Sequence, residues 1–122
     1  MSDSKIQKLL SKNKNPSPIS PAYSVTNADM PIMLKIRLDN DDMHSFGYNS
    51  LVRILQTGTE HITLFYSTHL GVITITGHNL VPLYDALSQH KVEWIREQKE
   101  VVSKDSDTTL ITEIKLRTYE DL

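Results

Sequence analysis

The chain has no cysteine among its 122 residues. Disulfide bonds, cysteine-based zinc sites and thiol nucleophiles are therefore excluded. No apolar run reaches the roughly 18 residues of a membrane-spanning helix, and residues 1–12 lack the apolar stretch of a secretory signal peptide. We therefore expect a cytoplasmic protein that does not associate with a membrane.

Glycine is also scarce, and a predicted turn or strand end accounts for each of the four. No glycine-rich loop is left to bind nucleotide phosphates, and no segment resembles the nucleophile elbow of hydrolases. The five histidines show none of the short spacings typical of metal ligands, and the acidic segment 39–42 departs from the calcium-loop pattern. We therefore predict no catalytic residues, no metal site and no cofactor.

Charge is distributed unevenly along the chain. Residues 1–29 carry four lysines and two aspartates, whereas residues 30–122 carry nine basic and thirteen acidic side chains. Affinity for nucleic acid comes largely from neutralising phosphates with basic side chains. The acidic balance of residues 30–122 therefore argues against a nucleic-acid partner.

The proline pattern separates a tail from a folded domain. Three prolines within residues 16–21 forbid a helix and disfavour a strand, so residues 1–30 are predicted to form a flexible tail. The alternative is a docking segment that uses the two Ser-Pro pairs of this region. A single domain is predicted over residues 31–118, and residues 119–122 are expected to fray.

Alternation of apolar and polar residues predicts the strands. Residues 32–38 follow a strict period of two, which is typical of a strand with one buried and one solvated face. Further strands are predicted over residues 51–55, 61–66, 71–76, 92–95 and 110–117. The short connections before residue 76 favour antiparallel neighbours.

One helix is predicted over residues 79–90. Asn79 is a favourable N-cap, and Pro82 falls in the first turn, where its missing N–H is not needed. The apolar stripe of this helix consists of Leu80, Leu83, Tyr84 and Leu87. The predicted fold is α+β: a mostly antiparallel sheet of five or six short strands with one helix packed on one face, in the order β-β-β-β-α-β-β. A small bent barrel with the helix as a plug is the alternative.

Residues 75–81, Ile-Thr-Gly-His-Asn-Leu-Val, resemble the second signature of Sm-like RNA-binding proteins. In that family an apolar strand runs into Arg-Gly-Asn, whose loop lines a nucleotide pocket within a ring of small barrels. The resemblance implies a nucleic-acid-binding barrel that uses Gly77, His78 and Asn79. Thr76 stands where the family has its basic residue, and a helix rather than a strand is predicted next. This alternative would be favoured by a basic stripe on one sheet face, formed by Lys35, Arg37, Arg53 and Lys115.

The aromatic residues supply the other candidates for a binding surface. Tyr84 and Trp94 flank the predicted turn from helix to strand, and with His78 and Asn79 they are the candidate binding residues. Short strands leave sheet edges that need cover, and no catalytic constellation is visible. We therefore predict a non-enzymatic interaction module that self-associates through its sheet or binds a protein partner. The alternatives are the nucleic-acid-binding barrel and an enzyme whose site is built between protomers.

Overall fold

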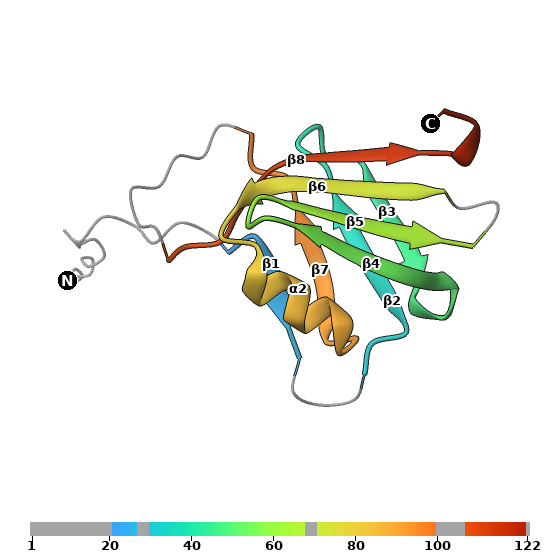
Figure 1. Ribbon diagram of the computed structural model, residues 1–122, viewed down its shortest axis with the longest axis horizontal. Coiled ribbons are helices and arrows are strands. Elements are labelled where there is room, and N and C mark those ends of the chain that lie inside the picture. Colours follow the sequence, from blue (N-terminus) through green and yellow to red (C-terminus); the bar gives the residue numbers. More distant parts are fainter. Residues whose placement is uncertain (1–20, 27–29, 68–70, 100–106, 122) are drawn as a thin grey trace, which may run out of the picture.

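The computed structural model describes residues 21–26, 30–67, 71–99 and 107–121 (Figure 1). Within them lie eight strands, one α-helix and two short 3-10 helices: β1 (Tyr23–Val25), β2 (Met33–Arg37), β3 (Met43–Gly47), η1 (Tyr48–Ser50), β4 (Leu51–Thr57), β5 (His61–Tyr66), β6 (Val72–His78), α2 (Val81–Ser88), β7 (Val92–Arg96), β8 (Leu110–Arg117) and η2 (Tyr119–Asp121). The first sheet has the strand order β1-β7-β2-β3, and the second has the order β4-β5-β6-β8. Every pairing is antiparallel except that of β2 with β7.

The two sheets pack face to face and enclose one core. Figure 1 shows the second sheet lying across the first. Leu34 and Ile36 from the first sheet, and Leu64 and Ile75 from the second, have no exposed surface. The mixed α and β content agrees with the prediction, but the expectation of a single sheet is wrong. Alternation along a strand shows that one face is buried, without showing whether a helix or another sheet covers it.

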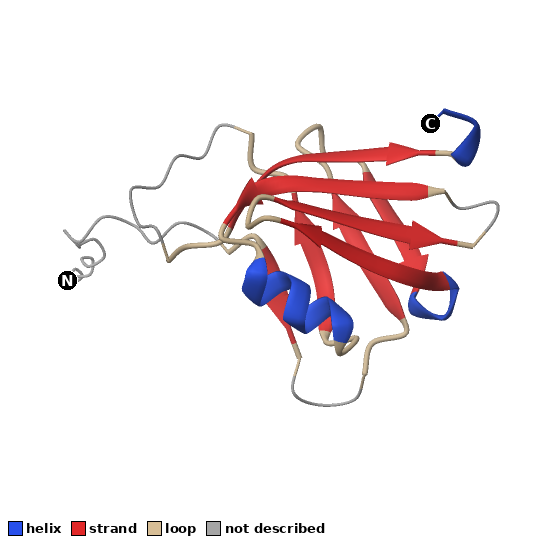
Figure 2. Ribbon diagram, in the orientation of Figure 1, coloured by secondary structure: helices blue, strands red, loops and turns tan. Residues whose placement is uncertain are grey.

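Helix α2 lies at the side of this sandwich and contacts β4 of one sheet and β7 of the other (Figure 2). Its position corrects the prediction of a helix packed on a sheet face. Leu83 and Leu87 are fully buried, as the apolar stripe indicated, and Pro82 lies in the first turn. Within the described parts of the chain, no helix is long and apolar enough to cross a membrane.

The helix is shorter than predicted because residues on both sides of it leave the helical conformation. Asn79 and His90 have φ angles of 53° and 56°, in the left-handed region. Leu80 occupies the N-cap position, and no side chain caps the helix there. The prediction of Asn79 as the N-cap is therefore wrong. Its side-chain amide instead donates a hydrogen bond to the Asp107 carbonyl at 2.7 Å.

Two strands were not predicted. β1 comes from the segment assigned to the tail and pairs antiparallel with β7. β3 follows the acidic turn and pairs antiparallel with β2. With these strands the order becomes six strands, one helix and two strands, which corrects the predicted order. Residues 1–20, to which the tail prediction also applies, lie outside the described residues.

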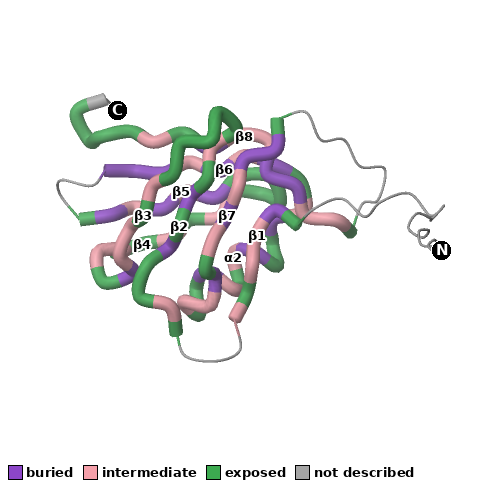
Figure 3. Tube along the Cα trace, turned by 180° about the vertical axis from the view of Figure 1, so that it is seen from behind, coloured by how far each residue is buried: buried purple, intermediate pink, exposed green. Residues whose placement is uncertain are grey.

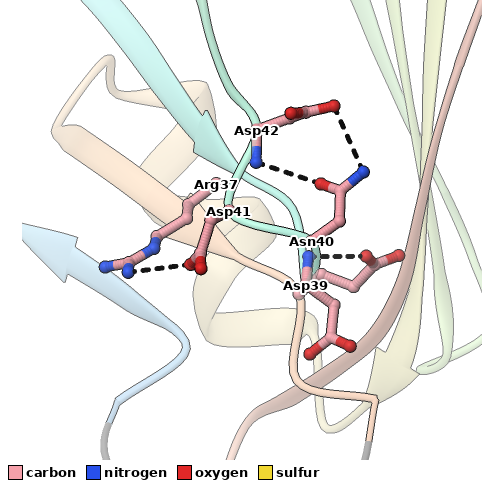
Figure 4. Close-up of polar contacts among 6 residues, drawn as sticks. Arg37, Asp39, Asn40, Asp41 and Asp42 are labelled. Carbon is pink, nitrogen blue, oxygen red and sulfur yellow. Dashed lines mark hydrogen bonds and ion pairs between the residues drawn. The ribbon is translucent and has the colours of Figure 1, made fainter.

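A buried carboxylate links the two sheets. The backbone N–H of Glu97 donates to the Arg37 carbonyl at 2.9 Å, directly after β7. Its Oε1 accepts the N–H of Asp39 at 3.0 Å, and its Oε2 accepts the N–H of Ile114 in β8 at 2.8 Å. Figure 4 shows the acidic turn that contains Asp39, where Asn40 Oδ1 accepts the N–H of Asp42. The Glu97 side chain therefore ties the β2–β3 turn to the edge of the second sheet.

Candidate functional site: a cationic sheet face

The outer face of the first sheet gathers basic and apolar side chains from three adjacent strands. Figure 3 looks onto this face. Lys35 in β2 pairs with Trp94 in β7, and Arg37 pairs with Arg96 on one side and with Met43 of β3 on the other. Directly paired residues project on the same side of a sheet. We call these five residues, Lys35, Arg37, Met43, Trp94 and Arg96, the cationic face.

Local sequence determines which side chains point outward. In β2, the fully buried Leu34 and Ile36 alternate with the exposed Lys35 and Arg37. In β7, Ile95 is buried between Trp94 and Arg96. Because neighbouring residues of a strand point to opposite sides, Lys35 and Arg37 in β2, and Trp94 and Arg96 on either side of the buried Ile95, face away from the core.

The five residues line a hollow of about 320 Å³. The guanidinium carbon of Arg96 lies 5.9 Å from the centre of the Trp94 ring, in cation–π range. Arg96 Nε also donates a hydrogen bond to the Pro21 carbonyl at 2.9 Å. These two contacts hold the Arg96 guanidinium beside the indole, so the hollow has one wall that is both aromatic and positively charged.

Arg37 forms the other wall and has one acidic neighbour. Its Nη2 lies 3.1 Å from Oδ1 of Asp41, which is the contact drawn on the left of Figure 4. The Asp41 side chain is 80% exposed and the Arg37 side chain 53% exposed. An exposed ion pair of this kind contributes about 0–1 kcal/mol. A carboxylate from another molecule can therefore replace Asp41 at little cost.

The predicted basic stripe does not lie on one sheet. Lys35 and Arg37 belong to the first sheet, whereas Arg53 lies in β4 and Lys115 in β8, the two edges of the second sheet. Arg53 packs over the ring of Phe65, with its guanidinium carbon 5.4 Å from the ring centre. The basic residues Lys35 and Arg37 therefore share a face with Arg96 rather than with Arg53 and Lys115. Acidic residues also lie in strands, since Glu93 belongs to β7 and Glu113 to β8.

The four predicted binding residues fall into separate places. His78 ends β6, and its Nδ1 lies 3.7 Å from Oε2 of Glu60 in the β4–β5 turn. Asn79 accepts a hydrogen bond at its carbonyl from the Thr109 hydroxyl, at 2.7 Å. Tyr84 is partly buried in α2 and packs against the core. Of the four, Trp94 alone lies on the cationic face.

Sequence reasoning selected Trp94 as an aromatic residue and named Lys35 and Arg37 in a basic stripe with Arg53 and Lys115, but it did not select Arg96 or place these cations around Trp94. The alternation in residues 33–37 and the Trp-x-Arg spacing at residues 94–96 predict outward-facing side chains. Neither pattern shows that β2 and β7 are neighbours, because parallel strands are joined by a long crossover. The pairing is a property of the fold as a whole.

In the described part of the chain, no three His, Asp or Glu side chains are grouped so that they could hold a metal ion. The chain matches no family model, no curated protein and no solved structure. The cationic face is therefore the feature from which a function can be inferred.

Proposed function

We propose that this protein is a non-enzymatic interaction module that binds an acidic segment of a partner protein on the cationic face. The observation that supports this proposal is the parallel register of β2 and β7, which places Lys35, Arg37 and Arg96 around Trp94. Lysine and arginine form charge-assisted hydrogen bonds with carboxylates. Tryptophan and arginine are also the residues that most often dominate the binding energy of protein interfaces.

The apolar side chains of this face favour a protein partner over nucleic acid. Met33 is 40% exposed and Met43 61% exposed, and both belong to the outer side of the sheet. Exposed methionines adapt to varied apolar side chains. Proteins that bind single-stranded nucleic acid stack successive bases on several aromatic rings. Among the described residues of this face, Trp94 is the one aromatic, and Arg96 already lies against its ring.

The acidic residues next to the cationic face also favour a protein partner over nucleic acid. Asp39, Asp41 and Asp42 lie in the turn at the end of β2, next to Arg37. A phosphate backbone that crosses the face would also pass these three aspartates, and their negative charges would repel the phosphates. A short peptide can place one or two carboxylates at Lys35 and Arg37 and leave the aspartates untouched.

The test uses the only tryptophan of the chain as its own reporter. Trp94 emission is followed while full-length protein is titrated with a capped peptide of alternating valine and glutamate, at near-physiological salt. We expect saturable binding. Neutralising Lys35 and Arg37 together, as Lys35→Gln/Arg37→Gln, should weaken it about tenfold or more.

The matched control removes two charges from the second sheet, as Arg53→Gln/Lys115→Gln, and should leave the affinity within about twofold. Equal weakening by both double variants would show a response to net charge alone and would contradict the proposal. Tighter binding of a single-stranded RNA than of the peptide, with a steep loss on adding salt, would favour the nucleic-acid alternative instead.

A further inference from the structure

The edge of the first sheet at β3 carries backbone groups that have no partner strand within the described parts of the chain. Among the described residues, β3 is the last strand of this sheet and pairs with β2 alone. At the two ends of the pairing, Leu38 N–H donates to the Asp42 carbonyl at 2.8 Å and Tyr48 N–H donates to the Ile32 carbonyl at 3.0 Å. Hydrogen-bonded and non-bonded pairs alternate along an antiparallel ladder. The even-numbered residues of β3 therefore bond to β2, and the N–H and C=O groups of the odd-numbered residues point away from the sheet.

This edge lacks the usual protection against strand addition. Natural edge strands are often blocked by proline, by charged side chains or by a bulge. β3 reads Met-His-Ser-Phe-Gly, and its pairing with β2 runs in register without a bulge. Met43 and Ser45 carry outward N–H and C=O groups, and Gly47 carries an outward N–H, whereas the Gly47 carbonyl belongs to the first turn of η1, of which Gly47 is the N-cap. Two of them have small side chains, so the approach of another backbone is sterically open.

Resting on the function proposed above, we infer that an extended segment of the partner protein adds as a fifth strand to the β3 edge. Its side chains would alternate between the two sides of the sheet. Those on the outer side lie next to Met43 and Ser45, about 10 Å from the backbone of β2. Glutamate on the added strand, and Lys35 and Arg37 on β2, are long enough to meet across this distance. The outer positions therefore select acidic residues.

The inner positions select apolar residues. His44 and Phe46 point inward from β3, are partly buried, and have stacked rings with centres 6.4 Å apart. Phe46 in turn contacts the ring of Tyr66 in the second sheet, at 5.1 Å between ring centres. An apolar side chain on the added strand would extend this row and cover the exposed part of both rings. The segment that fits is therefore one in which acidic and apolar residues alternate.

Charge argues against the two occupants that this chain itself supplies. Residues 1–29 have a net positive charge, with four lysines and two aspartates. β3 of a second copy carries no acidic residue, and edge-to-edge pairing would join two cationic faces into one sheet. Like charges brought together in this way are unfavourable. An acidic partner segment has neither disadvantage.

The experiment compares three capped Val-Glu repeat peptides with full-length protein, again by Trp94 emission: one unmodified, one N-methylated on its glutamates and one N-methylated on its valines. In an added strand, alternate N–H groups face β3. Antiparallel addition places the glutamate N–H groups toward Met43 and Ser45, whereas parallel addition places the valine N–H groups there. We expect one methylated peptide to bind at least about tenfold more weakly than the other, since it loses several backbone hydrogen bonds.

The outcomes separate this inference from the function on which it rests. If the unmodified peptide binds tightly and the two methylated peptides bind with equal affinity to each other, strand addition is overturned. The cationic face then remains as the binding site. No binding of the unmodified peptide overturns both proposals. A dimer in light scattering that the unmodified peptide fails to dissociate would show that a second copy occupies this edge, and would overturn the assignment to a partner segment.

Discussion

Glu97 and Ile114 join the two sheets through one hydrogen bond, in which the buried carboxylate accepts the strand's N–H at 2.8 Å. Ile114 lies in β8, an edge strand whose outward N–H groups would otherwise lack a partner. The following residue continues this cover, because the Gln98 N–H donates to the Ile111 carbonyl at 2.7 Å. Residues 97–98 therefore satisfy the β8 edge, whereas the β3 edge has no comparable cover among the described residues.

We predict that Glu97→Gln destabilises the protein by about 1.5–3 kcal/mol. The carboxylate accepts the N–H groups of both Asp39 and Ile114. A glutamine has one acceptor oxygen and would turn its NH2 group toward one of these donors. Urea denaturation followed by circular dichroism measures the change.

The matched control is Glu93→Gln, in the exposed part of β7, where the carboxylate accepts a long hydrogen bond from the Ser24 hydroxyl at 3.3 Å. Its free energy of unfolding should change by no more than about 0.5 kcal/mol. If the two substitutions changed the free energy of unfolding equally, the hydrogen bonds of the buried Glu97 carboxylate would contribute no more to stability than those of an exposed one.

A second prediction concerns Gly77, which belongs to the segment that resembles the Sm-like signature. A Cβ atom at this position would overlap the carbonyl of Leu110 in β8, where the pairing of β6 and β8 shifts register. Gly77→Ala should therefore cost about 1–3 kcal/mol or more, because the neighbouring strand has to move. Thermal unfolding is the measurement.

Gly47→Ala provides the comparison, since the nearest atom to a Cβ there is Met33 Sδ at 3.7 Å, an ordinary contact. We expect a change within about 0.5 kcal/mol. If Gly77→Ala were equally harmless, the close approach of β6 and β8 could not be the reason for glycine at this position.

Two buried tyrosines predict how stability depends on alkaline pH. Burial raises the pKa of Tyr48 from 10.0 to about 12. Burial raises the pKa of Tyr66 as well, and the nearby Tyr48 adds to the effect. The unfolded chain therefore loses these protons at lower pH than the folded protein. The stabilisation is complete below pH 10 and is lost as the pH rises toward 12.

Denaturation at pH 9 and at pH 11 measures this loss, and Tyr66→Phe should reduce it, because the variant has one phenol fewer to ionise. The two hydroxyls also differ at neutral pH. Tyr48 donates to the Val92 carbonyl at 2.6 Å, whereas no group in the described residues forms a hydrogen bond with the Tyr66 hydroxyl. Tyr48→Phe should cost about 0.5–1.5 kcal/mol and Tyr66→Phe close to nothing. The reverse order would contradict these hydrogen-bond assignments.

Some of the fold could be predicted from the sequence because burial leaves a local pattern. β5 and β8 have the predicted bounds. The sequence of β5 is densely apolar, and apolar and polar residues alternate in the second half of β8. β3 was missed because His44 and Ser45 interrupt its apolar pattern, and β1 is too short to show a period. Asn79 has the residue type of an N-cap, yet its left-handed φ depends on contacts with residues 107–109 that lie far away in the chain.

The candidate site was less predictable than the fold for the same reason. Trp94 was selected by residue type, but its neighbours Lys35 and Arg37 come from a strand near the other end of the chain. The outward direction of each side chain follows from local alternation. Their proximity follows from the parallel pairing of β2 with β7, two strands that β3 to β6 and the helix separate in the sequence.

The last prediction divides the N-terminal region at residue 21. Residues 21–26 take part in the first sheet: the Arg96 N–H donates to the Ala22 carbonyl at 2.9 Å, Arg96 Nε donates to the Pro21 carbonyl, and the Thr26 N–H donates to the Lys91 carbonyl. Ala22 is also 2% exposed and belongs to the core. Deletion of residues 1–26 should therefore lower the melting temperature by at least about 5 °C. It should also weaken binding of the Val-Glu peptide, because the Arg96 side chain loses the acceptor that holds it beside Trp94.

Deletion of residues 1–20 keeps all of these contacts. The composition of this segment, rich in prolines and lysines, predicts a flexible tail. We therefore expect the melting temperature to shift by no more than about 2 °C and the peptide affinity to stay within about twofold. Comparing the two deletions by differential scanning calorimetry and by Trp94 emission separates the part of the N-terminal region that belongs to the sheet from the predicted tail. A large loss of stability on removing residues 1–20 alone would show that the tail packs against the domain. It would then contradict the prediction that residues 1–30 form a flexible tail, for the part of that tail that precedes β1.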